Sequence, residues 1–124
     1  MSGGWTPFPN VLLDEVMPRL RDTEFRVLCV LVRETIGRRD TNGNRQRRVW
    51  LSQSLLMRKT GRAGEAISRA IEVLCLSGLI DIQDAVGRPL TSSRARRAFR
   101  GSVYYSLHSS IQAEISEKRT RKSE

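Results

Sequence analysis

The sequence is poor in the side chains that build most catalytic and metal sites. It contains one histidine, His108, and two cysteines, Cys29 and Cys75, among 124 residues. The cysteines form no CxxC pair and no cluster with histidine, so we expect no metal site and no cofactor. The sequence shows no recognisable pairing of a nucleophile with a general base. The Gly61-x-x-Gly64 element also lacks the Gly-Lys-Ser/Thr of a phosphate-binding loop. The composition therefore predicts a protein that is not an enzyme.

Long apolar runs are missing as well. The longest run, at residues 27–32, is far shorter than the roughly 20 apolar residues that cross a membrane. The N-terminus also lacks the basic-then-apolar order of a signal peptide. Cys29 and Cys75 lie inside apolar helical patterns and read as small buried side chains, as in a reducing compartment. We expect a cytoplasmic protein that has no membrane contact.

Acidic residues are scarce in two parts of the chain, and these parts give it a formal net charge of +9. Residues 38–64 carry seven arginines and Lys59 against one acid, Asp40. No acid occurs between Asp84 and Glu114, an interval that holds five arginines. A basic charge segregated in this way is typical of nucleic-acid binding, although a solvated basic surface would give the same count.

The pattern at residues 52–79 predicts two helices joined by a tight turn. Ser52 is a good N-cap, Gly61 can take the positive φ of a sharp turn, and Gly78 can end the second helix. The second helix has one apolar stripe at helical spacing, formed by Ile67, Ala70, Ile71 and Leu74. A helix-turn-helix motif has this arrangement and places its second helix in a DNA groove. A two-helix hairpin in an unrelated small helical protein would share the pattern.

Two further helices are predicted before this motif. The first runs from a cap at Asn10 to Met17 and is ended by Pro18. The second is capped by Asp22 or Thr23 and runs to about residue 36. This second helix is apolar nearly all round, so we expect it to be the buried core of the domain.

Short strands are predicted at residues 48–51, 79–82 and 103–107, and the last two enclose an arginine-rich loop at residues 85–101. The expected fold is therefore α+β, mostly helical: a winged helix-turn-helix with a long basic wing. Residues 1–9 form an extended N-terminal arm, residues 10–108 the winged-helix domain, and residues 109–124 a C-terminal helix and charged tail.

The sequence resembles a known family in several places. WTPFPNVLLD at residues 5–14 resembles the opening of the N-terminal domain of lambda-type phage replication protein O. The segments TEFRVL at 23–28 and RETIG at 33–37, and parts of residues 50–80, look like its second helix, helix-turn-helix and first wing strand. The resemblance covers roughly residues 5–82, and the Pro-Asn-x-Leu-Leu-Asp piece is its most specific part. The wing loop of this chain departs from the family because it is long and very basic.

The resemblance implies a replication initiator that binds repeated or palindromic origin sites in double-stranded DNA, as a monomer or weak homodimer. It further implies helicase-loading partners, recruited through a region that is not in this chain. Two other functions remain open: a winged-helix transcriptional regulator, and a protein–protein module of a primosome. The net charge of +9 disfavours the protein–protein module, because a surface for protein assembly would not need such an excess of positive charge.

Candidate DNA contacts fall into three groups. Residues at the start of the second motif helix, off its apolar stripe, should face the major groove, and Arg69 is the best candidate to read a base. This group is Arg62, Gly64, Glu65, Ser68 and Arg69. The wing group, expected to reach the backbone or a minor groove, is Arg88, Arg94, Arg96, Arg97 and Arg100. The group expected at DNA phosphates is Arg45, Arg47, Arg48, Ser52 and Lys59. For each residue, a solvated surface position is the alternative.

Overall fold

The computed structural model describes residues 6–38, 42–43, 47–90, 92–99, 101–109 and 111, and it has an α+β fold in which helices predominate. The prediction of a mostly helical α+β chain is confirmed. In chain order the elements are η1 (Leu12–Val16), η2 (Met17–Arg19), α1 (Asp22–Glu34), β1 (Arg48–Trp50), α2 (Gln53–Thr60), α3 (Gly64–Leu76), β2 (Ile80–Gln83), α4 (Ser93–Ala98) and β3 (Tyr104–Leu107).

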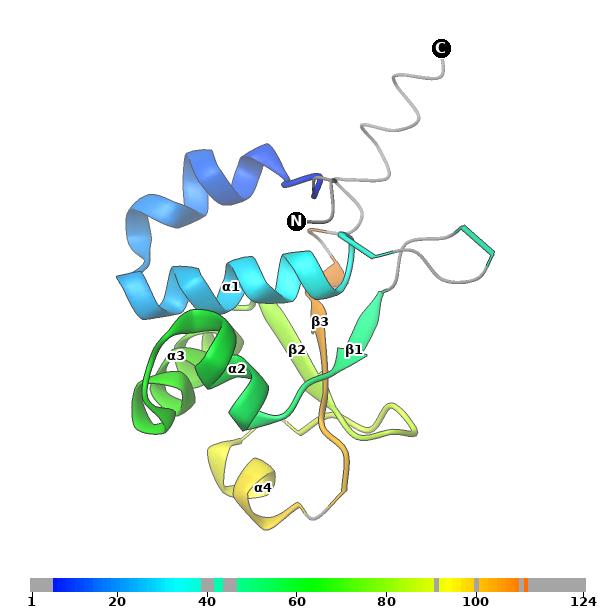
Figure 1. Cartoon of the computed structure of the whole chain (residues 1–124). Coiled ribbons are helices and arrows are strands. Elements are labelled where there is room, and N and C mark those ends of the chain that lie inside the picture. The colour runs from blue at the N-terminus through cyan, green and yellow to red at the C-terminus, as the bar shows by residue number, and fades with distance from the viewer. Residues whose placement is uncertain are drawn as a thin grey trace.

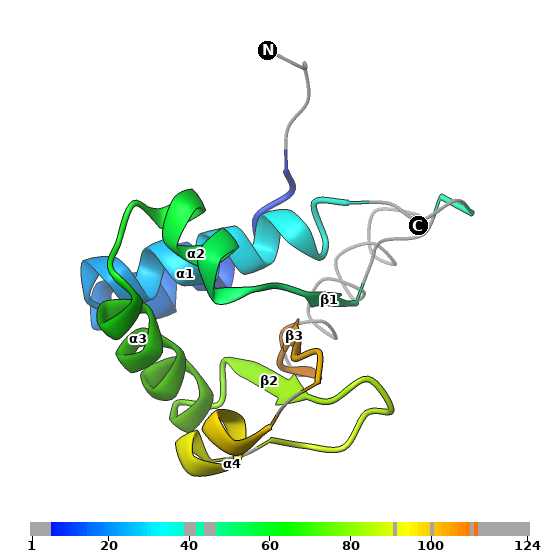
Figure 2. The same cartoon turned by 60° about the horizontal axis from the view of Figure 1, so that its bottom comes forward.

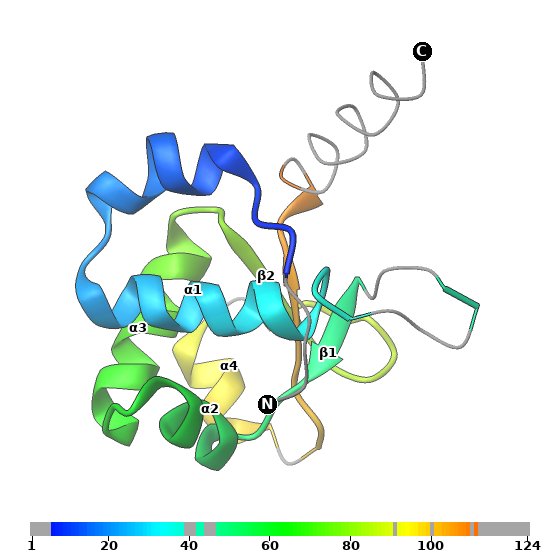
Figure 3. The same cartoon turned by 45° about the horizontal axis from the view of Figure 1, so that its top comes forward.

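Helix α1 is the centre of the molecule. Val27, Leu28, Leu31 and Val32 have no solvent exposure, and α1 packs against α2, α3 and β3. The N-terminal helical segment lies on one side of α1, and α2 and α3 lie on the other (Figures 1 and 3). The prediction that this helix forms the core is confirmed, because an apolar circumference is stable only when neighbours cover it on several sides.

The ends of α1 differ from the prediction. Neither Asp22 nor Thr23 caps the helix, because both already lie in its first turn. The residue before the helix is Arg21, and its backbone N–H donates to Glu24 Oε1 at 3.0 Å. At the other end α1 stops at Glu34 and a turn follows, so the helix is about two residues shorter than expected.

The N-terminal helical segment also extends past its predicted end. Pro18 does not stop it at Met17, because proline falls in the first turn of the 3₁₀ helix η2, where no backbone N–H is needed. Asn10 is itself helical rather than a cap. Leu12 is fully buried, so the segment docks on the core through this side chain.

The three strands form an antiparallel sheet in the order β1-β3-β2. Tyr105 of β3 lies between Val49 of β1 and Ile82 of β2. All three predicted strands are present, with bounds shifted by one residue. Strand β2 follows α3 after a short turn, and Figure 2 shows it beginning beside the end of that helix.

The connection between β2 and β3 was predicted to be an irregular loop, and this is wrong in part. The connection contains the short helix α4, which is capped by Ser92 Oγ accepting from the Ala95 N–H at 3.0 Å. Alanine and arginine are good helix formers, which favours a helix here. Repulsion among the arginines does not prevent it, because Arg96 pairs with Glu72 of α3.

The two ends of the chain are described only in part. Residues 6–9 have no regular structure, as predicted for an arm, and Phe8 packs edge-on against Phe25 with ring centroids 6.2 Å apart. Residues 1–5 lie outside the described residues. Of the predicted C-terminal helix and tail, only Ser109 and Ile111 are described, and Ile111 is buried.

We predict that Leu28→Ala lowers the free energy of unfolding by about 2–5 kcal/mol, because it removes a fully buried side chain from the centre of the core. Leu13→Ala is the matched control, since Leu13 is exposed on η1, and it should cost less than about 1 kcal/mol. Denaturant unfolding of both variants measures the difference. Equal losses in the two variants would show that α1 is not the core.

Candidate nucleic-acid interface

Helices α2 and α3 are joined by the tight turn that the sequence predicts. Ser52 Oγ accepts from the Leu55 N–H at 3.1 Å, and so caps α2. Gly61 ends α2 in the left-handed conformation, with φ of 70°, and its N–H donates to Met57 O at 2.9 Å. Glycine takes this conformation at no steric cost, so the chain can reverse within a few residues and begin α3 at Gly64.

The two faces of α3 differ sharply. Its inward face carries the buried residues Ile67, Ala70, Ile71 and Leu74. Glu65 and Arg69 lie on the outward face, with side chains 90% and 80% exposed, and they contact each other at 3.5 Å. An exposed pair of this kind contributes little to stability, so the Arg69 guanidinium is available to a ligand.

Gln53 connects the first turns of the two helices. Its Nε2 donates to Gly64 O at 2.9 Å and to Ser68 Oγ at 3.2 Å. A Cβ on Gly64 would lie 3.1 Å from this nitrogen, closer than most Cβ contacts. Gly64 therefore lets Gln53 approach the backbone, which is a structural role, and its predicted DNA contact stays a prediction.

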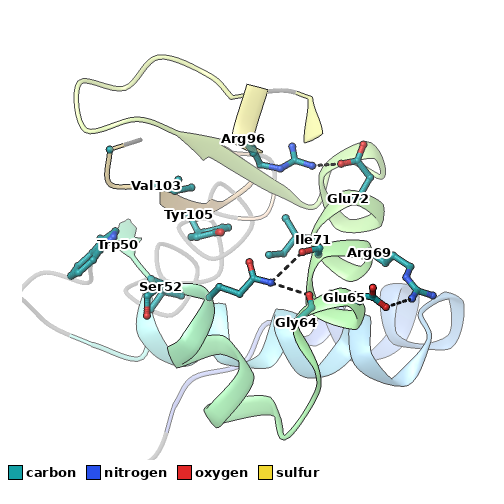
Figure 4. Close-up of a pocket in the computed structure, with 14 residues that line it drawn as sticks. Trp50, Ser52, Gly64, Glu65, Arg69, Ile71, Glu72, Arg96, Val103 and Tyr105 are labelled. Atoms are coloured by element: carbon teal, nitrogen blue, oxygen red, sulfur yellow. Dashed lines mark hydrogen bonds and ion pairs between the residues drawn. The ribbon is translucent and has the colours of Figure 1, made fainter. Parts of the chain in front are cut away.

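An open groove runs beside the outward face of α3 (Figure 4). The first half of α3, with Gln53 bonded to it, forms one side of the groove, and Val103 and Tyr105 lie on the other. Ser52 and Gly101 also line the groove. Trp50 stands at one end of the groove, and Arg96 and Glu72 stand at the other. The groove thus brings Glu65, Ser68 and Arg69 together with residues from the β2–β3 connection and from β1.

Arg62 does not belong to this groove. Its guanidinium binds the Asp22 carboxylate at the start of α1, and this hydrogen bond holds the pKa of Asp22 below its usual value. Arg26 of α1 also contacts Asp22 and donates to Thr60 O at 2.8 Å. Arg62 therefore ties the turn between α2 and α3 to α1, instead of facing outward with Arg69.

The predicted wing residues separate into different environments. Arg88 is 82% exposed in a turn that Asp84 closes by accepting the backbone N–H groups of Val86 and Arg88, at 3.0 and 2.8 Å. Arg94 is exposed on α4. The Arg96 side chain is only 11% exposed and binds Glu72. The side chain of Arg97 and the whole of Arg100 lie outside the described residues.

The residues predicted at DNA phosphates are likewise dispersed. Arg48 lies over the Tyr104 ring at 4.4 Å and donates to Ala85 O at 2.9 Å, so it holds β1 against the turn after β2. Lys59 lies 3.9 Å from the Glu34 carboxylate of α1. Ser52 caps α2 and also lines the groove. Arg47 is exposed, and Arg45 lies outside the described residues.

Two groove residues were missed from the sequence. Gln53 looked like an ordinary helix position, and only the fold brings it to Gly64 and Ser68. Trp50 was treated as a strand residue, yet it is 56% exposed at the end of the groove. Trp50 stands between two other apolar residues, Val49 and Leu51, so the sequence has no polar–apolar alternation from which this exposure could be read.

Comparison with known proteins gives no match, whether to a protein-family model, a curated protein or a solved structure. Within the described part of the chain, no group of three or more His, Cys, Asp or Glu side chains could hold a metal ion. No helix among these residues is long and apolar enough to cross a membrane. Burial raises the pKa of both thiols, Cys29 and Cys75, which are half-buried.

Proposed function

We propose that this chain binds duplex DNA as a winged helix, with α3 in the major groove and the β2–β3 connection beside it. The observation that carries the proposal is the outward face of the first half of α3, where Arg69 is exposed beside an open groove. A major groove admits one α-helix, and arginine can bond a guanine through two hydrogen bonds. Arg69 is the residue proposed to read a base, and Glu65 is a candidate acceptor for a cytosine amine.

The chemistry of the groove suits a phosphate strand. When a helix occupies the major groove, a sugar-phosphate strand passes along each side of it. The groove beside α3 offers hydroxyl and guanidinium groups from Ser52, Ser68 and Arg69. Groups of these kinds make most protein–phosphate contacts, and such contacts fix the position of the duplex without reading its sequence.

The distribution of charge supports the same proposal. Arg47, Arg58 and Arg94 are exposed and form no ion pair with any residue that the structure describes. They add to the exposed cation Arg88 and to a formal net charge of +9. Release of DNA counterions by such cations would supply most of the sequence-independent affinity.

The biological role that we propose is origin binding by a replication initiator of phage or plasmid type. This step is supported by the resemblance of residues 5–14 to the opening of lambda-type replication protein O. It is consistent with a domain that binds DNA without catalysing a reaction. Repeated or palindromic duplex sites are the expected ligands, and helicase-loading proteins the expected partners.

We predict that affinity for a duplex falls steeply with salt. Contacts to roughly five to eight phosphates give a slope of log K against log salt of about −4 to −7. Fluorescence anisotropy of a labelled random-sequence duplex across a salt series measures this slope. A flat response, or no binding at low salt, would overturn the proposal of DNA binding.

We predict that Arg69→Ala weakens binding to the preferred site by about 1–3 kcal/mol and has little effect on random DNA. The preferred site is first obtained by selection from a random oligonucleotide pool. Arg19→Ala is the control, because it removes the same charge from η2, on the side of α1 away from α3. If Arg69→Ala weakened both duplexes equally, Arg69 would be a phosphate contact and not a base-reading residue.

A further inference from the structure

Helix α4 is attached to α3 by one ion pair. The guanidinium of Arg96 binds the Glu72 carboxylate, and its Nη1 donates to Leu90 O at 3.3 Å. Arg96 therefore joins three parts of the chain: α4, the segment that leaves β2, and the outward side of α3. Figure 4 shows the pair at the end of the groove, with Arg96 reaching across to Glu72.

Helix α4 lies in the segment that leads to the second side of the groove. Gly101 and Val103, which line the groove, come three and five residues after the end of α4, while Tyr105 is held by the sheet. The first side belongs to α2 and α3, which are fixed on α1. Among the described residues the Arg96–Glu72 pair is the one ion pair that joins α4 to α3, and Arg96 also lies beside the Cys75 thiol of α3, so Arg96 helps to set how α4 faces the first side.

The pair has a second, opposite consequence for binding an anion. Glu72 lines the groove, where its negative charge alone would repel a phosphate. Arg96 neutralises this charge, but because it is 11% exposed it has little surface left for a ligand. Loss of the Glu72 carboxylate would therefore have two opposite effects on DNA affinity. It would raise the affinity by removing a negative charge, and it would lower the affinity by releasing α4.

We propose that the Arg96–Glu72 pair is a clamp that holds α4 and the segment after it as the second wall of a groove for one strand of duplex DNA. This inference rests on the proposed function. Arg96 and Glu72 are positioning residues in this proposal. The sequence predicted a direct DNA contact for Arg96, and the proposal replaces that contact with a positioning role. The exposed Arg94, which lies on α4, is carried to the duplex by the same clamp.

Glu72→Gln separates the two consequences, because glutamine keeps the shape of the side chain and removes its charge. The clamp predicts that affinity for a random-sequence duplex falls about threefold to tenfold, as the loss of one pairwise interaction implies. If the negative charge of Glu72 were its only effect, Glu72→Gln would bind DNA more tightly. Asp81→Asn is the matched control: it removes an exposed carboxylate of β2 that does not line the groove, and its affinity should be equal or higher.

The charge-swapped variant Glu72→Arg with Arg96→Glu should recover most of the lost affinity. Hydroxyl-radical footprinting should show that Glu72→Gln loses protection on one strand only, while the protection by α3 remains. Amide hydrogen exchange should be faster at Arg96 and Phe99, whose N–H groups bond within α4, and unchanged in α1. If Glu72→Gln lost its fold, Arg96→Lys, which keeps the charge without the planar fork, would be measured in the same way.

The outcomes for the two proposals are distinct. Failure of the unmodified protein to bind any duplex would overturn the proposed function. If the unmodified protein bound and Glu72→Gln bound equally or more tightly, with an unchanged footprint, the clamp would be overturned while DNA binding stood. Weaker binding with a one-sided loss of protection supports both.

Discussion

The burial of α1 on both of its sides is the constraint on which the rest of the structure depends. Val27, Leu28, Leu31 and Val32 are inaccessible to solvent, so neighbours must cover the broad apolar face of this helix. The N-terminal helical segment covers one side, and α2 and α3 cover the other. Because the apolar stripe of α3 is committed to this contact, its opposite face is turned outward, and that face borders the groove.

Three acidic residues join elements of the fold. Asp22 holds the turn before α3, Glu34 holds the end of α2 through Lys59, and Glu72 holds α4. The pKa of Asp22 is lowered mainly by the Arg62 hydrogen bond, and that of Glu34 mainly by the Arg38 hydrogen bond. Because both pKa values are lowered in the folded state, the stabilisation by Asp22 and Glu34 is present at neutral pH and is lost as acid protonates the two carboxylates. The cations that have no acidic partner are left at the surface.

Local patterns predicted most of the fold, and long-range pairing explains what they missed. The helix spacing, Ser52, Gly61 and Gly78 located the two motif helices and their turn, since caps and left-handed glycines are local signals. The exposure of Glu65, Ser68 and Arg69 followed from the same spacing. Helix α4 was missed although its Ser92 cap is a local signal, whereas the burial of Arg96 could not be predicted, because it depends on Glu72, which lies 24 residues away in the chain. Arg62 was assigned to the outer face for the same reason, as its partner Asp22 is 40 residues away.

We propose that the groove between α3 and the β2–β3 connection is the DNA-binding surface. Amide chemical-shift mapping by NMR, with a short duplex added to saturation at low salt, tests it most directly. We predict that the largest changes in amide chemical shift fall at Gln53, Ser68, Arg69 and Val103, while the shifts of η1 and η2 remain unchanged. Shifts concentrated on η1 and η2, with the groove unaffected, would contradict it.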